Sequence, residues 1–332
     1  MAKFGWLASH ESYQPEVLVE QAVRAENVGF DAVFGSDHFH PWVDDVSAAG
    51  FVWSWFGAVA ARTTTIELAT SVTTPLFHYH PALIAQSSAT VDRLSDGRFF
   101  LGVGTGENIN SGPMGFPFPA YAERIRRMKE AMEVMHRLLA GEKVDFDGEF
   151  YLLDKARLYS PPVSTVPILM GAGGPKSAAF AGANADGLIT SVKDPAETEA
   201  RVLKPFREAA ELAGKTDPPI MATRWVVLAQ DDDEAWEALI TMRGLRAPGR
   251  LEAVDPMVLR QRADEMDRAE ILDKFTVVSE VEQLIAAYRP LVEQIGADYV
   301  SIQVASVDPD ATIDLIGRDV LPALRNVEPV GA

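Results

Sequence analysis

The feature that most constrains the fold is an eightfold alternation of short apolar segments with longer segments of helical periodicity. Short apolar runs predict β-strands, and apolar residues at helical spacing predict amphipathic helices. Because strands that alternate with helices pair in parallel, eight such units over 332 residues predict a (β/α)8 barrel, the TIM barrel. The predicted strands are residues 3–9, 31–36, 65–73, 98–103, 167–171, 187–191, 222–229 and 299–304.

Each predicted strand is followed by a predicted helix, and two further segments interrupt the alternation. Residues 141–166 contain a short hairpin pattern at 146–151, and residues 243–277 form an irregular arm that contains several arginines. We therefore predict one α/β barrel domain over residues 1–332 with two insertions. The predicted helices are residues 15–27, 47–62, 81–94, 121–139, 196–213, 232–242, 281–295 and 313–324, together with a short alanine-rich helix that follows the turn at 173–175 and ends at residue 185.

The composition excludes several classes of protein. The chain contains no cysteine, which excludes disulfides, iron–sulfur clusters, thiolate zinc sites and cysteine nucleophiles. A net charge of −18 argues against nucleic-acid binding, which requires a basic surface. The first residues lack the apolar run of a signal peptide, and no segment reaches the ~20 apolar residues of a membrane helix. We therefore expect a cytoplasmic protein with neither a membrane nor a nucleic-acid partner.

The stretch Gly35–Trp42, which follows the apolar run Phe30–Phe34 at the end of the second predicted strand, is dense in reactive side chains. It supplies one carboxylate, two imidazoles, a proline and an indole. Taken alone, the stretch has two interpretations. It is either a polar loop whose histidines face solvent and whose Trp42 covers a core edge, or a functional site.

Other unusual residues also follow predicted strands. In a TIM barrel the active site lies at the C-terminal ends of the strands, so these loops are expected to meet in space. Polar or glycine-rich residues follow five of the strands, and this number favours a functional site over polar loops without a function. The residues are Asp37, His38 and Trp42, then Ser71 to Pro75, then Gly104 to Glu107 with Asn110, then Gly173 and Gly174, and then Ser191 to Lys193.

His38 and Glu107 are candidates for an acid–base pair, because histidine titrates near neutrality and a buried carboxyl group can do so. The same residue types can bind a metal, but the order His38-Phe39-His40 offers no third ligand at a suitable spacing. We therefore predict no metal site. Residues 102–106 lack the G-x-G-x-x-G spacing of a dinucleotide loop. Their glycines either form tight turns or let backbone amides approach a flat ring or a phosphate.

Three basic residues are candidates for an anion site. Lys193 at a strand end, with Arg250 and Lys274 from the arm, could hold a phosphate through charge-assisted hydrogen bonds. Alternatively, Arg250 and Lys274 form surface ion pairs with nearby acids such as Glu252 and Asp273. The spacing leaves both interpretations open.

The chain carries four motifs in order, namely Ser36–Trp42, Ser71–Pro75, Gly102–Glu107 and Gly173–Pro175. Together they resemble the luciferase-like superfamily, and more narrowly the coenzyme F420-dependent glucose-6-phosphate dehydrogenase group. The similarity extends over essentially the whole chain. The run Ser-Asp-His-Phe-x-Pro-Trp together with Gly-Thr-Gly-Glu is specific for the branch that uses a deazaflavin.

The resemblance implies a (β/α)8 barrel with coenzyme F420 (an 8-hydroxy-5-deazaflavin) against the strand ends. It also implies a non-proline cis peptide, here Ser71-Val72, behind the ring, and a homodimer. The residues that the resemblance assigns to the cofactor are Asp37, Ser71, Val72, Thr74, Gly106, Asn110, Gly173 and Gly174.

The resemblance further implies the reaction. A hydride leaves the anomeric carbon of the sugar for C5 of the deazaflavin, which gives a lactone. His38, Trp42 and Glu107 would surround the reacting carbon. His38 would act as the base for the hydroxyl proton and Glu107 as the acid that serves the cofactor ring. The reverse assignment of these two roles stays open.

The phosphate site departs from the family pattern of two lysines and one arginine. Lys193 matches, but the other positions are Arg250 and Lys274, with lysine and arginine exchanged. The charge is kept, so we expect a sugar phosphate, glucose 6-phosphate, although the two side chains present donors differently. An F420-dependent secondary-alcohol dehydrogenase is the main alternative and would not need three cations. A flavin-dependent luciferase-like monooxygenase or a non-catalytic deazaflavin binder is less favoured.

Overall fold

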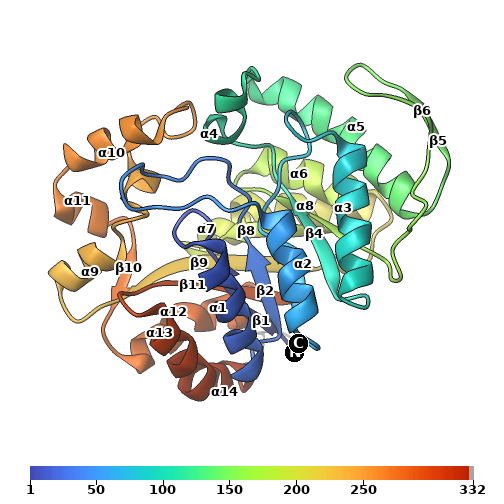
Figure 1. The fold of residues 1–332 in the computed structure, drawn as a ribbon. Coiled ribbons are helices and arrows are strands. Elements are labelled where there is room, and N and C mark those ends of the chain that lie inside the picture. The colour runs from blue at the N-terminus through green and yellow to red at the C-terminus, as the bar shows by residue number, and fades with distance from the viewer. Residues whose placement is uncertain (329–332) are drawn as a thin grey trace.

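The computed structural model describes residues 1–328 and shows a closed barrel of parallel strands (Figure 1). Strand β9 pairs with β11 on one side and with β8 on the other, which closes the sheet. The predicted TIM barrel is confirmed; residues 329–332 of the predicted domain lie outside the described residues. The barrel strands are, in spatial order, β1 (Lys3–Ala8), β2 (Ala32–Gly35), β3 (Glu67–Thr70), β4 (Phe99–Val103), β7 (Ile168–Gly171), β8 (Gly187–Ser191), β9 (Ile220–Leu228) and β11 (Tyr299–Ala305).

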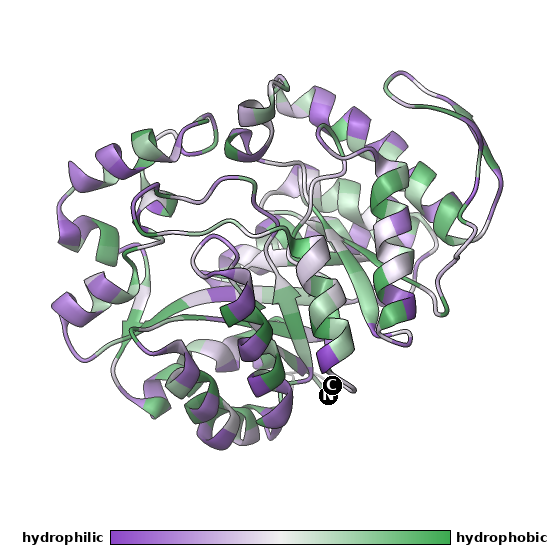
Figure 2. Ribbon diagram, viewed as in Figure 1, coloured by the Kyte–Doolittle hydropathy of each residue, from purple (hydrophilic) through white to green (hydrophobic). Residues whose placement is uncertain are grey.

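Alternate side chains of the strands face two different apolar layers, as the period of a β-strand requires. One layer fills the barrel and includes Phe34, Phe100 and Met221. The rings of Phe34 and Phe100 meet edge to face with centroids 6.1 Å apart. The other layer, with Val33 and Leu68, packs against the helices. Figure 2 shows the consequence, with hydrophobic strands inside and hydrophilic outer helix faces.

The surrounding helices begin at recognisable signals. Proline occupies the first turn of several of them, and Asp194, Asp231 and Asp308 accept hydrogen bonds from backbone N–H groups at helix starts, as helix-capping residues do. Within residues 1–328, no helix combines the length and the apolarity that crossing a membrane would require. The helices are α1 (Pro15–Asn27), α2 (Val52–Arg62), α3 (Pro81–Leu94), α5 (Tyr121–Leu139), α6 (Pro175–Asn184), α7 (Pro195–Thr198), α8 (Lys204–Leu212), α9 (Asp232–Ala238), α12 (Val281–Glu293), α13 (Pro309–Leu315) and α14 (Leu321–Arg325).

The first insertion is an antiparallel hairpin of β5 (Val144–Asp147) and β6 (Leu152–Ala156) that projects from the barrel beyond α5 (Figure 1). The predicted hairpin at 146–151 was placed too narrowly, because residues 148–151 form the turn. The Glu130 carboxylate of α5 accepts hydrogen bonds from the backbone N–H groups of Glu149, Phe150 and Tyr151. A helix side chain thus holds the turn of the hairpin.

The second insertion is ordered, and the prediction of an irregular arm was wrong. It contains the turn η3 (Arg243–Arg246), the helices α10 (Pro256–Asp264) and α11 (Arg268–Leu272), and the strand β10 (Thr276–Val278), which pairs with β9. These elements enclose their own apolar cluster, which also contains Trp42 and Ile109. Because each element is short, helical periodicity could not reveal it. The Asp255-Pro256 start signal of α10 was present in the sequence.

Two smaller differences affect the site. Residues 47–51 are not helical as predicted, because α2 begins at Val52. A single-turn helix α4 (Asn108–Ser111), followed by the turn η1 (Gly112–Met114), comes directly after Glu107 and was not predicted. Both segments lie at the C-terminal end of the barrel, where local contacts rather than periodicity determine the backbone.

The arm is tied to the loop after β2 by a buried arginine. The side chain of Arg243 is 4% exposed, and it donates hydrogen bonds to Asp45 at 2.7 Å and to Asp264 at 2.9 Å. Arg260 of α10 adds a contact of 2.6 Å with Asp44. These ion pairs therefore hold the arm over the loop that carries His38 and Trp42.

We expect Arg243→Ala to lower the free energy of unfolding by about 1–3 kcal/mol, because it removes a buried hydrogen-bonding hub between two segments. The loss of stability is moderate because the carboxylates of Asp45 and Asp264 are partly exposed and can be solvated by water once the arginine is removed. Urea unfolding and limited proteolysis of the arm would measure the effect. The control is Arg268→Ala, which breaks an exposed pair with Asp233 and should change little. Equal effects of the two variants would contradict the prediction.

Candidate active site

Apart from Arg250 and Lys274, which belong to the arm, the predicted site residues lie in the loops that follow β2, β3, β4, β7 and β8, which are consecutive neighbours in the sheet. These loops share the C-terminal end of the barrel, where TIM-barrel sites lie. The second insertion covers the same end, so that the site lies between the strand ends and the arm. The structure therefore brings the predicted residues to one region.

Asp37 lies directly beyond β2 and is held from two sides. Its carboxylate accepts a hydrogen bond from the Thr73 hydroxyl and another from the Tyr79 hydroxyl at 3.2 Å. Burial raises the pKa of Asp37, while the hydroxyl of Thr73, the charge of His38 and the hydroxyl of Tyr79 counteract that rise. A carboxyl group in such surroundings can serve as an acceptor or, once protonated, as a donor toward a polar ring edge.

His38, Trp42, Arg250 and Glu107 form one contiguous group. The His38 ring meets the edge of the buried Trp42 indole with centroids 4.9 Å apart. The Arg250 guanidinium lies 5.6 Å from the Trp42 ring centroid and donates to the Glu107 carboxylate at 2.5 Å. The structure thus brings the two acid–base candidates together through an arginine and an indole.

The hydrogen bonding of His38 indicates which ring nitrogen is free. Nδ1 lies 3.1 Å from the backbone carbonyl oxygen of His40, so in the neutral ring Nδ1 carries the proton and donates it. Nε2 then keeps its lone pair and can accept a proton. A cavity of about 350 Å³ adjoins His38. Its lining is mostly apolar and aromatic, which suits a planar ring, and consists of His38, Phe39, Ala49, Phe51, His78, Tyr79 and Met114.

Glu107 is positioned by contacts between the arm and α4. The backbone N–H of Asn108 donates to the carbonyl of Leu251 at 3.1 Å, and the Asn108 side chain donates to the carbonyl of Glu252 at 2.8 Å. Arg250 is therefore fixed next to Glu107 by its own neighbours in the chain. Of the two interpretations left open for Arg250, the structure shows an ion pair, but with Glu107 instead of a surface acid.

The other residues assigned to the cofactor have defined backbone conformations or contacts. The peptide Ser71-Val72 is cis, as the resemblance implied. Gly106 has a φ of +81°, which favours glycine, and a Cβ there would lie 2.8 Å from the Thr74 methyl. Asn110 is buried, and its side-chain oxygen accepts from the N–H of Phe39 at 3.0 Å.

Gly173 and Gly174, at the start of α6, border open space. A Cβ built at either position would meet no atom within 4 Å, so the absence of side chains leaves room there for a ligand to approach the backbone. The exposed backbone at these two glycines could therefore contact a flat ring or an anionic group.

Cations gather between β8 and the arm, around a cavity of about 300 Å³. Lys193 and Lys274 line it, and so does Arg246, which was not among the predicted residues. The charge of Arg246 is the largest cause that lowers the pKa of Lys193, followed by burial and by Arg250 and Lys274. The three predicted cations are therefore neighbours, and a fourth belongs with them.

Sequence reasoning missed two residues of the region. Arg246 was visible as one of several arginines in the arm, but no pattern distinguished it. Glu11 lies three residues after the end of β1, is 4% exposed, and accepts a hydrogen bond from the Ser36 hydroxyl. A charged residue in the loop that follows a buried strand was the signal that could have found it.

Metal ligands do not converge in the described part of the chain, since residues 1–328 contain no group of three histidine, aspartate or glutamate side chains suited to hold an ion.

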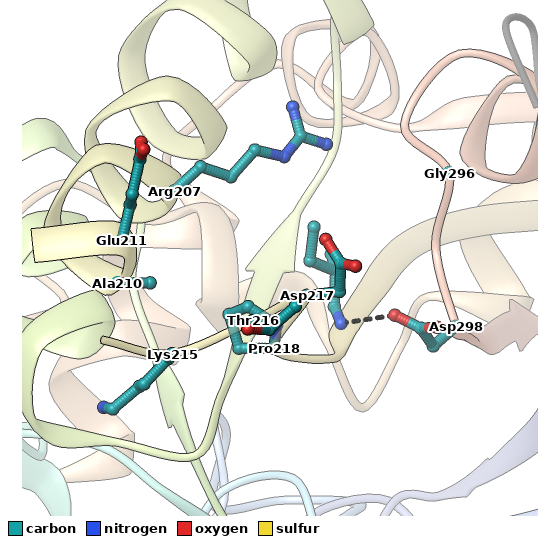
Figure 3. A pocket seen from close by; sticks show the side chains of 10 residues that line it. Arg207, Ala210, Glu211, Lys215, Thr216, Asp217, Pro218, Gly296 and Asp298 are labelled. Carbon is teal, nitrogen blue, oxygen red and sulfur yellow. Dashed lines mark hydrogen bonds between the residues drawn. The ribbon is translucent and has the colours of Figure 1, made fainter. Parts of the chain in front are cut away.

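A hollow of about 520 Å³ lies at the opposite end of the barrel (Figure 3). Two of its charged side chains, Asp298 and Lys215, are engaged in holding the fold. The Asp298 carboxylate accepts from the N–H of Ile220 at 2.8 Å, and the Lys215 ammonium donates to the carbonyls of Gly182 and Ala185. These contacts join strand and helix ends, so we assign this hollow no chemistry.

Comparisons with known proteins agree with this geometry. Residues 2–299 match the luciferase-like monooxygenase family. The F420-dependent glucose-6-phosphate dehydrogenase of Nakamurella multipartita is 36% identical over 97% of this chain and 96% of its own length. The protein of the same name from Intrasporangium calvum is 35% identical over 98% of this chain and 100% of its own.

Among solved structures, an F420-dependent secondary alcohol dehydrogenase in complex with an F420–acetone adduct is 32% identical. It has a TM-score of 0.91, with 98% of this chain and 99% of that chain covered. The coenzyme F420-dependent tetrahydromethanopterin reductase of Methanopyrus kandleri is 22% identical with a TM-score of 0.77, covers 97% of this chain and 99% of its own, and shares the fold.

Proposed function

This chain belongs to the luciferase-like monooxygenase family, and from that premise we propose that it is an F420-dependent dehydrogenase of a sugar 6-phosphate. The expected substrate is glucose 6-phosphate, which would be oxidised at C1 to 6-phosphogluconolactone. The names of the relatives from Nakamurella and Intrasporangium support this proposal.

One observation in the structure carries the choice of an anionic substrate. Lys193, Arg246 and Lys274 line one cavity, and Arg250 lies close enough to affect the pKa of Lys193. Because like charges this close repel one another, and their repulsion lowers the pKa of Lys193, the cluster is costly unless an anion binds. A neutral alcohol would leave Lys193 and Arg246, for which no carboxylate partner is found among the described residues, without an anion.

The residues at the strand ends fit coenzyme F420. Gly173 and Gly174 leave open space, Gly106 turns the backbone without a side chain, and Asp37 offers a half-buried carboxyl group. When bound, the cofactor supplies a hydride acceptor at C5 of the deazaflavin. We propose as its contacts Asp37, Ser71, Val72, Thr74, Gly106, Asn110, Gly173 and Gly174.

The oxidation removes one hydride from C1 of the sugar and one proton from its hydroxyl oxygen. We assign the proton to His38, because Nε2 is free while the bond from Nδ1 to the His40 carbonyl fixes the ring. Trp42 forms an apolar wall beside His38. Glu107, held by Arg250, would serve as the acid on the cofactor side.

The second candidate is an F420-dependent secondary-alcohol dehydrogenase. The TM-score of 0.91 with an enzyme of that name favours it. Such an enzyme would use the same acid–base group but would not need the cluster of cations. We therefore rank it below the sugar phosphate.

A substrate panel tests the choice. Purified protein with oxidised F420 should lose the visible absorbance of the cofactor when glucose 6-phosphate is added, and much more slowly with glucose or propan-2-ol at the same concentration. The difference is expected because only the phosphate satisfies the cations. If propan-2-ol reduces the cofactor and glucose 6-phosphate does not, the alcohol dehydrogenase assignment replaces ours.

We further propose that residues 1–332 form a single catalytic domain that works as a cytoplasmic homodimer. The absence of cysteine agrees with a reducing compartment. Light scattering of the purified protein would measure the oligomeric state.

A further inference from the structure

The cavity between β8 and the arm is lined by basic residues of two kinds. Some donate hydrogen bonds to the protein backbone, and others have donors that remain available to a ligand. Arg224 belongs to the wall, because its guanidinium donates to the carbonyls of Val192, Lys193 and Ala287. Its donors are therefore engaged with the backbone. Arg246 lines the same cavity, but its guanidinium is not bonded to the backbone in this way.

Arg246 has no counter-ion within residues 1–328. It forms no ion pair with any described aspartate or glutamate, although Asp273 also lines the cavity. Its Nε atom is buried and has no hydrogen-bond partner there. The guanidinium carbon lies 4.7 Å from the ring centroid of Phe275, a cation–π contact that does not use the N–H donors.

The surroundings make this isolation costly. Burial, and then the charge of Arg250, lower the pKa of Arg246, and Arg246 in turn is the main cause that lowers the pKa of Lys193. Half-buried cations normally have a carboxylate partner. A chain with 48 acidic and 30 basic residues could readily have provided one, so the arrangement is that of an anion-binding site.

The two neighbouring cations from the arm are already partnered. Arg250 donates to Glu107 at 2.5 Å, and Lys274 contacts Glu270 at 3.4 Å. Arg250 is further committed by its place over Trp42. Arg246 is thus the arginine of the cavity whose planar fork remains available for a two-point contact with a tetrahedral oxyanion.

We propose that Arg246 determines substrate specificity by binding the phosphate group of the substrate together with Lys193 and Lys274. The proposal rests on the proposed function and adds a residue to it. Arg250 then lies between the anion and Glu107 and contributes less to the affinity for phosphate. The expected preference is for a phosphate monoester over the free sugar.

Calorimetric titration of inorganic phosphate into the cofactor-free protein at low ionic strength tests the proposal. Arg246→Met, which keeps the stem of the side chain, should bind phosphate about 10- to 100-fold more weakly than the wild type, because it loses hydrogen bonds to a charged group. Arg246→Lys should recover part of the affinity. The matched control is Arg201→Met, which removes an exposed arginine paired with Glu197 and should bind like the wild type.

Kinetics with F420 separate binding from a structural effect. Arg246→Met should raise KM for glucose 6-phosphate by a similar factor with little change in kcat, and it should leave the KM for free glucose unchanged. A parallel loss with glucose, or a lowered melting temperature that explains the loss, would overturn the proposal. So would phosphate affinity equal to that of the wild type, or a wild type that binds no phosphate.

The two proposals can fail separately. If phosphate binding depends on Arg246 but glucose 6-phosphate does not reduce F420, the proposed function fails and the anion site stands. If glucose 6-phosphate reduces F420 equally well in Arg246→Met, the role of Arg246 fails and the proposed function stands.

Discussion

Replacing His38 by alanine is expected to lower kcat with glucose 6-phosphate by about 10²- to 10⁴-fold, the usual contribution of a general base. The reason is the orientation of the ring, since the bond from Nδ1 to the His40 carbonyl leaves Nε2 free to accept a proton. F420 affinity, measured by fluorescence titration, should change little, because none of the proposed cofactor contacts is removed. Stopped-flow absorbance of the cofactor measures the rate.

The matched control is His40→Ala, which removes a neighbouring histidine whose Nδ1 contacts the Val254 carbonyl of the arm. It should retain most of the turnover. Unchanged turnover in His38→Ala would remove His38 from the mechanism. A large loss of F420 affinity would instead place His38 among the cofactor contacts.

The same measurement with Glu107→Gln decides which residue is the base. Loss of the base removes the acidic limb of the pH profile of kcat, whereas loss of the acid removes the alkaline limb. If Glu107→Gln loses the acidic limb, the two roles must be exchanged. The contact with Arg250 makes Gln a suitable replacement, because its amide oxygen can still accept from the guanidinium.

The sequence predicted the barrel well because its signals were local and repeated. Buried strands such as Phe99–Val103 are continuous apolar runs, and helices such as Pro81–Leu94 begin at proline and end near glycine. Such elements carry their own boundaries. The rule that barrel sites lie at the C-terminal strand ends then located the site region without any contact being known.

The arm could not be predicted in the same way. Its helices are stabilised by packing against Trp42 and Ile109 and by the ion pairs of Arg243, all of which join segments distant in the chain. Whether an arginine binds a carboxylate or remains free depends on such contacts. For that reason the pairing of Arg250 with Glu107 and the isolation of Arg246 became visible only in three dimensions.

The ionised carboxylate of Asp37 is proposed to bind the cofactor, but its ionisation near neutral pH lowers the stability of the folded protein. Burial raises its pKa above the 3.8 of an ordinary aspartate, although Thr73, His38 and Tyr79 favour the ionised form. The folded protein therefore binds a proton at this site more tightly than the unfolded chain does. The stability that Asp37 confers is fully present below pH ~4 and is lost as the pH rises through the higher folded-state pKa.

We therefore expect Asp37→Asn to raise the melting temperature at pH 7 to 8 by a few degrees, with a gain that shrinks toward pH 4. The amide carries no charge, and the hydroxyls of Thr73 and Tyr79 can accept hydrogen bonds as well as donate them. F420 affinity should fall about tenfold or more, because the amide cannot replace the charge-assisted hydrogen bond that the carboxylate is proposed to form with the cofactor. Differential scanning fluorimetry across pH and fluorescence titration would measure the two effects.

The control is Asp154→Asn, which removes the same charge from a side chain that is 84% exposed and should change neither property. A lower melting temperature of Asp37→Asn at every pH would show that the hydrogen bonds of the carboxylate outweigh its burial. Unchanged F420 affinity would exclude Asp37 from the cofactor contacts. The expected combination, a more stable protein that binds the cofactor less well, is typical of a buried charge kept for function.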